Sequence, residues 1–225
     1  CRGGAPVGGL DSGRAGANLD HHRAVSVRPP RTRPWHGAVK PNPPTGKTVY
    51  EEKRFSLRVC ELELTNGKTQ KRGVVIHPGA VVILPIAENG DLILIRNNRW
   101  QVGHRLLELP AGTLEPGEDP LQCAGRELVE ETGYAAAQIE AFHTFFPMPG
   151  GSTEVMHCFL ARKLTEVGQR LEPDEDIEVV PVSQDAIEKL LLNGDIVDGK
   201  TLALIGLYLL RQAKVSGDQF EESPK

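Results

Sequence analysis

The segment from Gly112 to Tyr134, which reads GTLEPGEDPLQCAGRELVEETGY, constrains the fold of this chain more than any other stretch. Asp119 stands before Pro120, and this pair is typical of a helix start, because the carboxylate accepts from the first amides and proline suits the first turn. Gly133 can end the helix in a left-handed conformation that other residues adopt only with strain. The segment therefore predicts a helix over residues 120–132.

The predicted helix carries an apolar stripe and an acidic arc. At about 100° per residue, Glu127, Glu130 and Glu131 fall within an arc of about 100°. Three carboxylates this close repel one another, and Arg126 can pair with Glu130 but cannot neutralise all three. A cluster of hard oxygen ligands suits magnesium or manganese, whereas the alternative is an ordinary solvated acidic face. The apolar stripe, which should pack against a sheet, consists of Leu121, Ala124, Gly125, Leu128 and Thr132.

The wider spacing of this segment resembles the signature of the Nudix hydrolase family, Gx5Ex7REUxEExGU, where U is a bulky apolar residue. At about 7% usage per residue type, seven fixed matches arise by chance with a probability of about 10⁻⁸ per starting position. The resemblance covers about residues 47 to 215. It implies an α+β fold, an α/β/α sandwich with a mixed sheet. The seven matching residues are Gly112, Glu118, Arg126, Glu127, Glu130, Glu131 and Gly133.

The same resemblance implies roles for the residues of this segment. Glu127 and Glu131 would be the principal ligands of magnesium, with manganese as an alternative cofactor. Glu130 would be a third ligand, and the Ala111 carbonyl a further donor. Glu130 and Arg126 are also expected to take part in catalysis, Arg126 mainly by orienting the glutamates.

Features outside this segment resemble the ADP-ribose pyrophosphatases of the family. These are the run LELPAG at residues 107–112, the run HPGA at residues 77–80, and the loop PMPGGSTE at residues 147–154. The loop is similar to an SPGG-[ST]-[ST]-E motif, with methionine at position 148 in place of serine. Its likeness implies that Pro149, Gly150 and Glu154 bind substrate, while the alternative is a simple tight turn.

An acidic run, EPDEDIE at residues 172–178, resembles the loop from which these enzymes supply a catalytic base. Glu175 is the expected base. The alternative candidates for the base are its neighbours Glu172, Asp174 and Glu178, and also Glu154. The other interpretation is an ordinary solvated acidic loop with no catalytic role.

Two arginines occupy places where similar enzymes present arginines to the substrate. Arg72 precedes an expected strand at residues 74–76, and Arg99 follows another at residues 92–95. A guanidinium suits phosphate because its donors form a rigid fork. Ordinary surface arginines are the alternative.

Strand and helix signals extend over the rest of the chain. Asn-Gly turns at residues 66–67 and 89–90 predict two hairpins, the first built from residues 55–64 and 74–76 and the second from residues 81–86 and 92–95. A short strand near residues 106–109 is followed by a glycine-bearing loop. Further strands are expected at 139–144, 155–161 and 177–182, and helices at 184–192 and 201–213.

Composition and charge divide the chain and exclude several classes of protein. Residues 1–45 are rich in Gly, Pro and Arg and are predicted to be a disordered tail or an artefactual extension, with a transit peptide as the alternative. Residues 46–76 form the N-terminal hairpin region, residues 77–215 the Nudix domain, and residues 216–225 a flexible C-terminus. By analogy with the family, the hairpin region predicts a homodimer.

The formal net charge of -4 argues against a nucleic-acid partner. The longest apolar runs are about half the ~18 residues that a transmembrane helix needs, so no membrane association is expected. Four widely spaced cysteines indicate neither zinc nor a disulfide framework, and reduced thiols in the cytoplasm are the default.

The expected function is magnesium-dependent hydrolysis of the pyrophosphate bond of ADP-ribose to AMP and ribose 5-phosphate. One alternative is a hydrolase of another nucleoside diphosphate sugar such as GDP-mannose. A non-catalytic Nudix domain that senses a nucleotide is a third reading, against which the intact glutamates argue, because they repel one another when no cation is bound.

Overall fold

A computed structural model of the chain describes residues 41–173 and 175–218. The predicted disordered tail, residues 1–45, lies outside the described residues up to residue 40, and residues 41–45 have no regular secondary structure. The predicted flexible C-terminus lies outside them from residue 219 on, whereas residues 216–218 belong to the last helix. No helix in the described part of the chain is long and apolar enough to cross a membrane.

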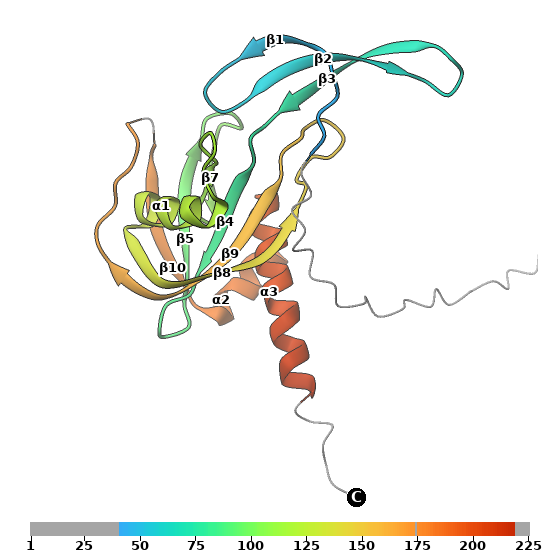
Figure 1. The fold of residues 1–225 in the computed structure, drawn as a ribbon. Coiled ribbons are helices and arrows are strands. Elements are labelled where there is room, and N and C mark those ends of the chain that lie inside the picture. The colour runs from blue at the N-terminus through green and yellow to red at the C-terminus, as the bar shows by residue number, and fades with distance from the viewer. Residues whose placement is uncertain (1–40, 174, 219–225) are drawn as a thin grey trace, which may run out of the picture. The chain divides into compact units, whose positions relative to one another are not determined.

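A mixed four-stranded sheet forms the centre of the fold (Figure 1). Its order is β7 (Ala111–Thr113), β4 (Ala80–Pro85), β9 (Met156–Glu166) and β8 (Tyr134–Phe145). β4 pairs in parallel with β9, and the two outer pairs are antiparallel. The glycine-bearing loop that the sequence predicts therefore contains the short strand β7.

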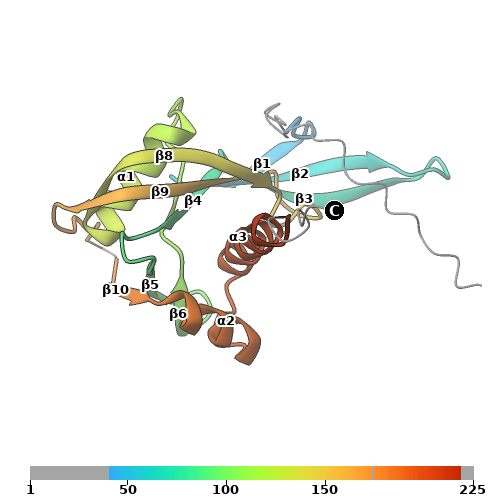
Figure 2. The ribbon, with the colours of Figure 1, turned by 90° about the horizontal axis from the view of Figure 1, so that it is seen from below.

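Helices cover both faces of this sheet. Successive side chains of a strand point to opposite faces, so Val81 and Ile83 of β4 pack against α1 (Pro120–Thr132). Val82 and Leu84 pack on the other face with residues of α2 (Gln184–Asn193) and α3 (Gly199–Asp218). Figure 2 shows α1 and α3 on opposite sides of β4. The expected α/β/α sandwich with a mixed sheet is confirmed.

A second sheet contains β5 (Leu92–Arg99) between β10 (Ile177–Val182) and β6 (His104–Glu108). The prediction that β4 and β5 form a hairpin is correct for the turn but wrong for the two strands, which do not pair with each other along their length. Gly90 adopts a left-handed φ of 88°, but only Ile86 and Leu92 pair across the turn before the two strands enter different sheets. β4 and residues 92–95 of β5 are buried and apolar on both faces, so their sequences lack the alternation that would specify a partner.

The N-terminal segment forms a separate antiparallel sheet of β1 (Lys47–Glu51), β2 (Ser56–Glu63) and β3 (Thr69–Ile76). The predicted first hairpin is present, since β2 and β3 pair along their whole length and Gly67 in the turn has a φ of 76°. At its far end β3 meets the loop of residues 147–154. The Val75 amide donates to the Gly151 carbonyl at 2.9 Å, and the Thr153 amide donates to the Val75 carbonyl at 2.9 Å.

Candidate active site

Helix α1 holds the acidic residues at defined places. The Asp119 carboxylate accepts from the Leu121 amide at 2.8 Å, and Gly133 ends the helix with a left-handed φ of 74°. Ala124 and Leu128 of the predicted apolar stripe are fully buried. The prediction for Leu121 is wrong, because this side chain is 47% exposed and Cys123 fills the inner face at that turn instead.

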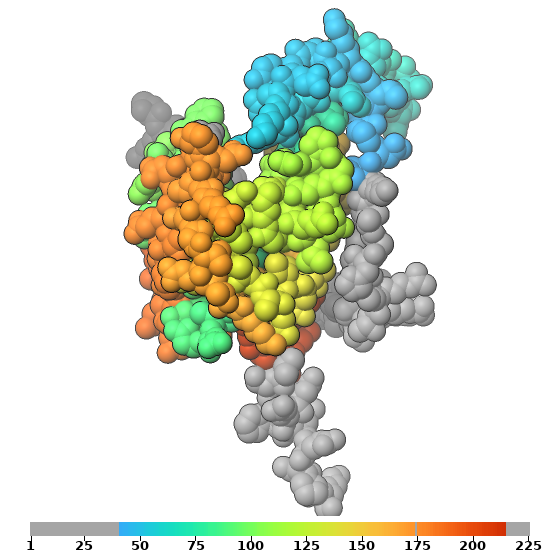
Figure 3. Space-filling model, turned by 60° about the vertical axis from the view of Figure 1, so that its left-hand side comes forward, coloured from blue at the N-terminus to red at the C-terminus, as the bar shows by residue number. Residues whose placement is uncertain are grey.

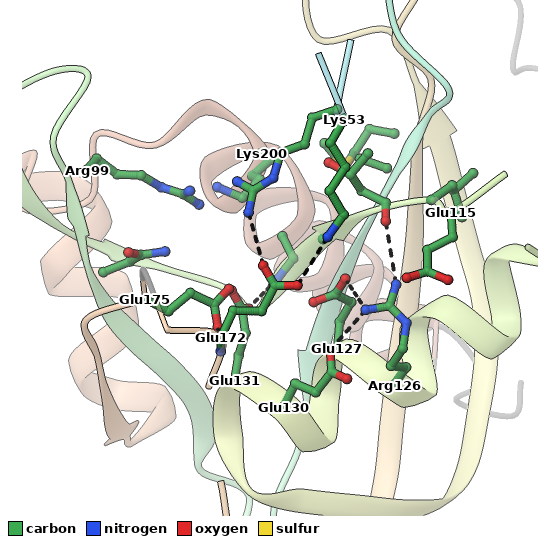
Figure 4. A pocket seen from close by; sticks show the side chains of 18 of the residues that line it. Lys53, Arg99, Glu115, Arg126, Glu127, Glu130, Glu131, Glu172, Glu175 and Lys200 are labelled. Carbon is green, nitrogen blue, oxygen red and sulfur yellow. Dashed lines mark hydrogen bonds and ion pairs between the residues drawn. The ribbon is translucent and has the colours of Figure 1, made fainter. Parts of the chain in front are cut away.

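A cavity of about 560 Å³ lies beside α1 and gathers most of the residues that the sequence singles out (Figure 4). Its walls come from α1, from β5 and β7, from the segment before β10 and from the start of α3. The predicted site residues that line it are Arg99, Ala111, Arg126, Glu127, Glu130, Glu131, Glu154 and Glu175.

Arg126 lines this cavity and binds three glutamates. Its Nε and Nη2 donate to the two carboxylate oxygens of Glu118 at 2.9 and 3.0 Å. Nη1 donates to Glu127 at 2.7 Å and to Glu130 at 2.9 Å. The bidentate contact with Arg126 lowers the pKa of Glu118 to about 2, and these carboxylates raise the pKa of Arg126. Arg126 thus offsets part of the repulsion on the acidic arc.

Glu127 and Glu131 are acidic groups buried at the bottom of the cavity, 8% and 3% exposed. Burial raises the pKa of Glu127 to about 7, although Arg126 acts in the opposite direction. Burial also raises the pKa of Glu131 to about 8, although its carboxylate accepts from the Ala111 amide at 2.8 Å. The nearby negative charge of Glu175 adds to both shifts.

These residues fit a divalent cation by their chemistry. Two buried carboxyl groups without enough positive charge around them are stabilised as anions by a hard cation that takes oxygen ligands. Within residues 41–173 and 175–218, no three His, Cys, Asp or Glu side chains converge as a ready-made metal cage. The reason is local, because Arg126 draws Glu127 and Glu130 toward itself while Glu131 bonds to the Ala111 amide.

Close packing explains why a glycine begins the acidic segment. A Cβ atom on Gly112 would overlap the carboxyl group of Glu127. Glycine at this position therefore lets β7 lie directly against the Glu127 side chain.

The other predicted site residues have varied surroundings. Glu175 lines the cavity and its carboxylate accepts from the Glu172 amide at 2.8 Å. Pro149 and Gly150 are exposed in the loop beside β3, and Arg72 is exposed on β3; none of the three lines the cavity. Of the alternative bases, Glu172 also lines the cavity, Glu178 forms an exposed pair with Arg96, and Asp174 lies outside the described residues.

An ion-pair network that the sequence did not predict forms one wall of the cavity. Glu108 is fully buried and receives a bidentate contact from Arg99, at 2.9 and 2.7 Å, and another from Lys200 at 2.5 Å. Lys200 also lies 3.0 Å from Asp198. Glu108 and Lys200 are 92 residues apart, so only the fold brings them together.

The turn between β1 and β2 also reaches the cavity and was missed. Lys53 and Arg54 line it and lie 3.5 and 3.4 Å from the carboxylate of Glu172. Figure 3 shows the N-terminal sheet, in blue, next to the orange segment that contains Glu172. Two adjacent basic residues in a turn would have been the only sequence signal.

Comparisons with known proteins show which family the chain is similar to. The family model described as the NUDIX domain matches residues 76–204. An ADP-ribose pyrophosphatase of Bacillus subtilis (strain 168) is 38% identical over 174 residues, which cover 74% of this chain and 94% of that protein. A GDP-mannose pyrophosphatase of Citrobacter koseri is 32% identical over 176 residues, covering 70% of this chain and 89% of that protein.

The fold comparison gives the same result. A crystal structure of an ADP compounds hydrolase superposes with a TM-score of 0.64 and 26% identity, and covers 74% of this chain and 92% of that one. The fold and the acidic cavity are those of a hydrolase of the α/β/α type, from a family that typically uses divalent metal ions. The chain belongs to the Nudix family and is a pyrophosphohydrolase that resembles ADP-ribose pyrophosphatases.

Proposed function

We propose that this enzyme hydrolyses the pyrophosphate bond of ADP-ribose in the presence of magnesium, and releases AMP and ribose 5-phosphate. The observation that carries the proposal is a single cavity that is lined by the buried Glu127 and Glu131 and also by Glu175. This arrangement provides anionic groups for a cation and, close to them, an acceptor for a proton.

Each residue of the cavity would have its own part in the hydrolysis. Glu127 and Glu131 would hold the magnesium ion, with Glu130 and the Ala111 carbonyl as further donors. Bound magnesium would neutralise charge on the pyrophosphate and lower the pKa of a water molecule. Glu175 would accept the proton of the water that attacks phosphorus. Arg126 would keep Glu127 and Glu130 oriented through the contacts at 2.7 and 2.9 Å.

The surroundings of the cavity support a nucleoside diphosphate sugar as substrate. Its volume of about 560 Å³ is within the range of pockets for small ligands. Arg99 and Glu154 line it and would contact the substrate, whereas Arg72, Pro149 and Gly150 would have to do so from its periphery. The relative that is 38% identical is named an ADP-ribose pyrophosphatase, which favours ADP-ribose.

GDP-mannose is the second candidate substrate. The relative at 32% identity is named a GDP-mannose pyrophosphatase. The methionine that replaces serine at position 148 is 51% exposed in the loop expected to bind ADP-ribose, and this departure keeps the second candidate open.

The assembly and the compartment belong to the same proposal. A homodimer built on residues 46–76 would add a second chain next to β3, and light scattering tests it. A single monomeric mass at micromolar concentration would refute the dimer. A cytoplasmic location agrees with the three free cysteines of the described residues, Cys60, Cys123 and Cys158.

A substrate panel tests the function. The protein is incubated with ADP-ribose, ADP-glucose and GDP-mannose in magnesium buffer, and nucleoside monophosphate and sugar phosphate are quantified. We expect equimolar AMP and ribose 5-phosphate from ADP-ribose, with the highest kcat/KM of the panel. A higher value for GDP-mannose would favour the second candidate, and no turnover of any substrate would refute the proposal.

A further inference from the structure

Asn97 is a largely buried polar residue that lines the cavity and has no part in the proposed metal binding or proton transfer. The residue as a whole is 7% exposed, its side chain forms no hydrogen bond with the described residues, and its amide atoms are not enclosed by protein, so they open into the cavity. An amide that faces a cavity and has no protein partner is free to bind water or a ligand. The position of Asn97 on the cavity wall therefore points to a ligand.

The wall around Asn97 is polar but has no excess charge. Asn97 and Arg99 share one face of β5, because side chains alternate along a strand. The two cations of this wall, Arg99 and Lys200, are matched by two carboxylates, Glu108 and Asp198. A neutral wall of this kind suits hydroxyl groups better than it suits a further phosphate.

An amide has two different ends, and the ligand must satisfy both. The NH2 group of Asn97 donates and its carbonyl oxygen accepts, whereas a phosphate oxygen only accepts. A phosphate would thus leave the Asn97 carbonyl unpaired inside the protein. Two neighbouring hydroxyl groups of a sugar satisfy both ends, since one accepts from the NH2 group and the other donates to the carbonyl.

The position of this wall distinguishes between the two sugars of a nucleoside diphosphate sugar. Glu108 binds the lining Arg99 and Lys200 from behind, since it is fully buried and does not line the cavity itself. Leu109 and Thr201 are also fully buried outside the lining, and the Thr201 hydroxyl accepts from the Leu109 amide at 2.8 Å. The cavity therefore ends at this wall. The ribose of the nucleoside carries a base that needs space beyond it, whereas the terminal sugar ends the molecule.

We propose that Asn97 binds neighbouring hydroxyl groups of the terminal sugar, the one released as sugar phosphate, and contributes to the choice among nucleoside diphosphate sugars. This inference rests on the proposed function. It adds a specificity residue that comes from the face of β5, separate from the glutamates of α1.

Binding of the two products tests the inference without turnover. Calorimetry in magnesium buffer compares AMP, ribose 5-phosphate and 2-deoxyribose 5-phosphate on the full-length wild type and on Asn97→Leu, which keeps the size of the side chain. The wild type should bind ribose 5-phosphate about fivefold to tenfold more tightly than the deoxy sugar. Asn97→Leu should lose this preference and bind AMP as the wild type does.

Two further variants keep the test decisive. Asn97→Ala only removes atoms, and replaces Asn97→Leu if that variant unfolds at a lower temperature than the wild type. Asn193→Leu, at the exposed end of α2, is the matched control and should retain the preference.

Each other outcome overturns the inference. It is wrong if the wild type does not bind ribose 5-phosphate, if Asn97→Leu keeps the preference, or if Asn97→Leu weakens AMP alone. The panel of substrates is scored separately. A wild type that binds the sugar phosphate with this preference but hydrolyses no nucleoside diphosphate sugar would refute the proposed function and leave only the contact between Asn97 and the sugar hydroxyl groups in place.

Discussion

The carboxyl group of Glu127 occupies the space that a side chain at Gly112 would need. Gly112 belongs to β7 and Glu127 to α1, so this contact joins the strand and the helix that form the acidic site. The spacing of the two residues in the sequence thus reflects direct packing. Any residue larger than glycine at position 112 must displace a proposed metal ligand.

We expect Gly112→Ala to weaken manganese binding and to lower turnover by about 10-fold to 100-fold, as changes next to metal ligands do. The added methyl group would push the Glu127 carboxylate from its contact with Arg126. Paramagnetic resonance of bound manganese, together with turnover, measures the effect. Gly206→Ala is the control, because a Cβ there meets no atom within 4 Å and alanine favours the helix. Equal activity of the two variants would contradict the role of the contact.

Glu131→Gln should lower turnover by at least about 10²-fold, which is the effect of removing other key electrostatic groups. Gln keeps the shape of the side chain and can still accept from the Ala111 amide, so the fold should remain intact. Thermal unfolding and turnover are measured side by side, with Glu188→Gln on the exposed face of α2 as the control. Wild-type turnover of Glu131→Gln would exclude this residue as a metal ligand.

The stability of the metal-free protein should depend on pH through Glu131. Its pKa rises from 4.5 in the unfolded chain to about 8 in the fold, because of burial. Between these values the folded state retains a proton that the unfolded chain has released, so the free energy of unfolding falls as pH rises. Above about pH 8 this loss is complete.

Glu131→Gln isolates this contribution, because the amide does not titrate. Urea unfolding with a chelator at about pH 5 and about pH 8 should show the variant gaining stability relative to the wild type at the higher pH. Magnesium should restore part of the wild-type stability there. A difference that does not change with pH would contradict the raised pKa.

Glu108 offers a test of stability within the ion-pair network. Glu108→Gln leaves Arg99 and Lys200 without their buried counter-charge, and should lower the free energy of unfolding by about 3 kcal/mol. Glu178→Gln removes a partner of Arg96 from an exposed pair and should cost less than about 1 kcal/mol. Chemical unfolding of both variants makes the comparison. Similar losses would mean that burial does not decide the strength of these pairs.

Local signals were sufficient for the parts of the fold that depend on neighbours in sequence. The cap at Asp119 and the glycine at 133 define α1, and the bounds predicted for β10 agree with the structure. The partners of β4 were not accessible in this way. Its parallel pairing with β9 joins residues more than 70 positions apart, and a strand that is buried on both faces gives no preference for a partner.

The candidate site likewise has one part that the sequence could predict and another part that it could not. The glutamates of α1 and the contact of Arg126 with Glu130 follow from helix geometry, since residues four apart lie on one face. Lys200 and Asn97 belong to no motif, and they matter only because the start of α3 and the second half of β5 lie at the same cavity. Prediction from sequence therefore reached the acidic side of the cavity, but on the wall formed by β5 and α3 it reached only Arg99.

The proposed base can be separated from its rivals by kinetics. Glu175→Gln should lower kcat by about 10²-fold or more and leave KM nearly unchanged, because the group would act on the water and not on the substrate. Glu154→Gln, on the other candidate of the same cavity, should raise KM more than it lowers kcat if it contacts the substrate. Glu166→Gln, at the exposed end of β9, controls for the loss of one negative charge. If kcat falls in Glu154→Gln and stays within about threefold of wild type in Glu175→Gln, then Glu154 is the base, since a general base contributes at least about 10²-fold.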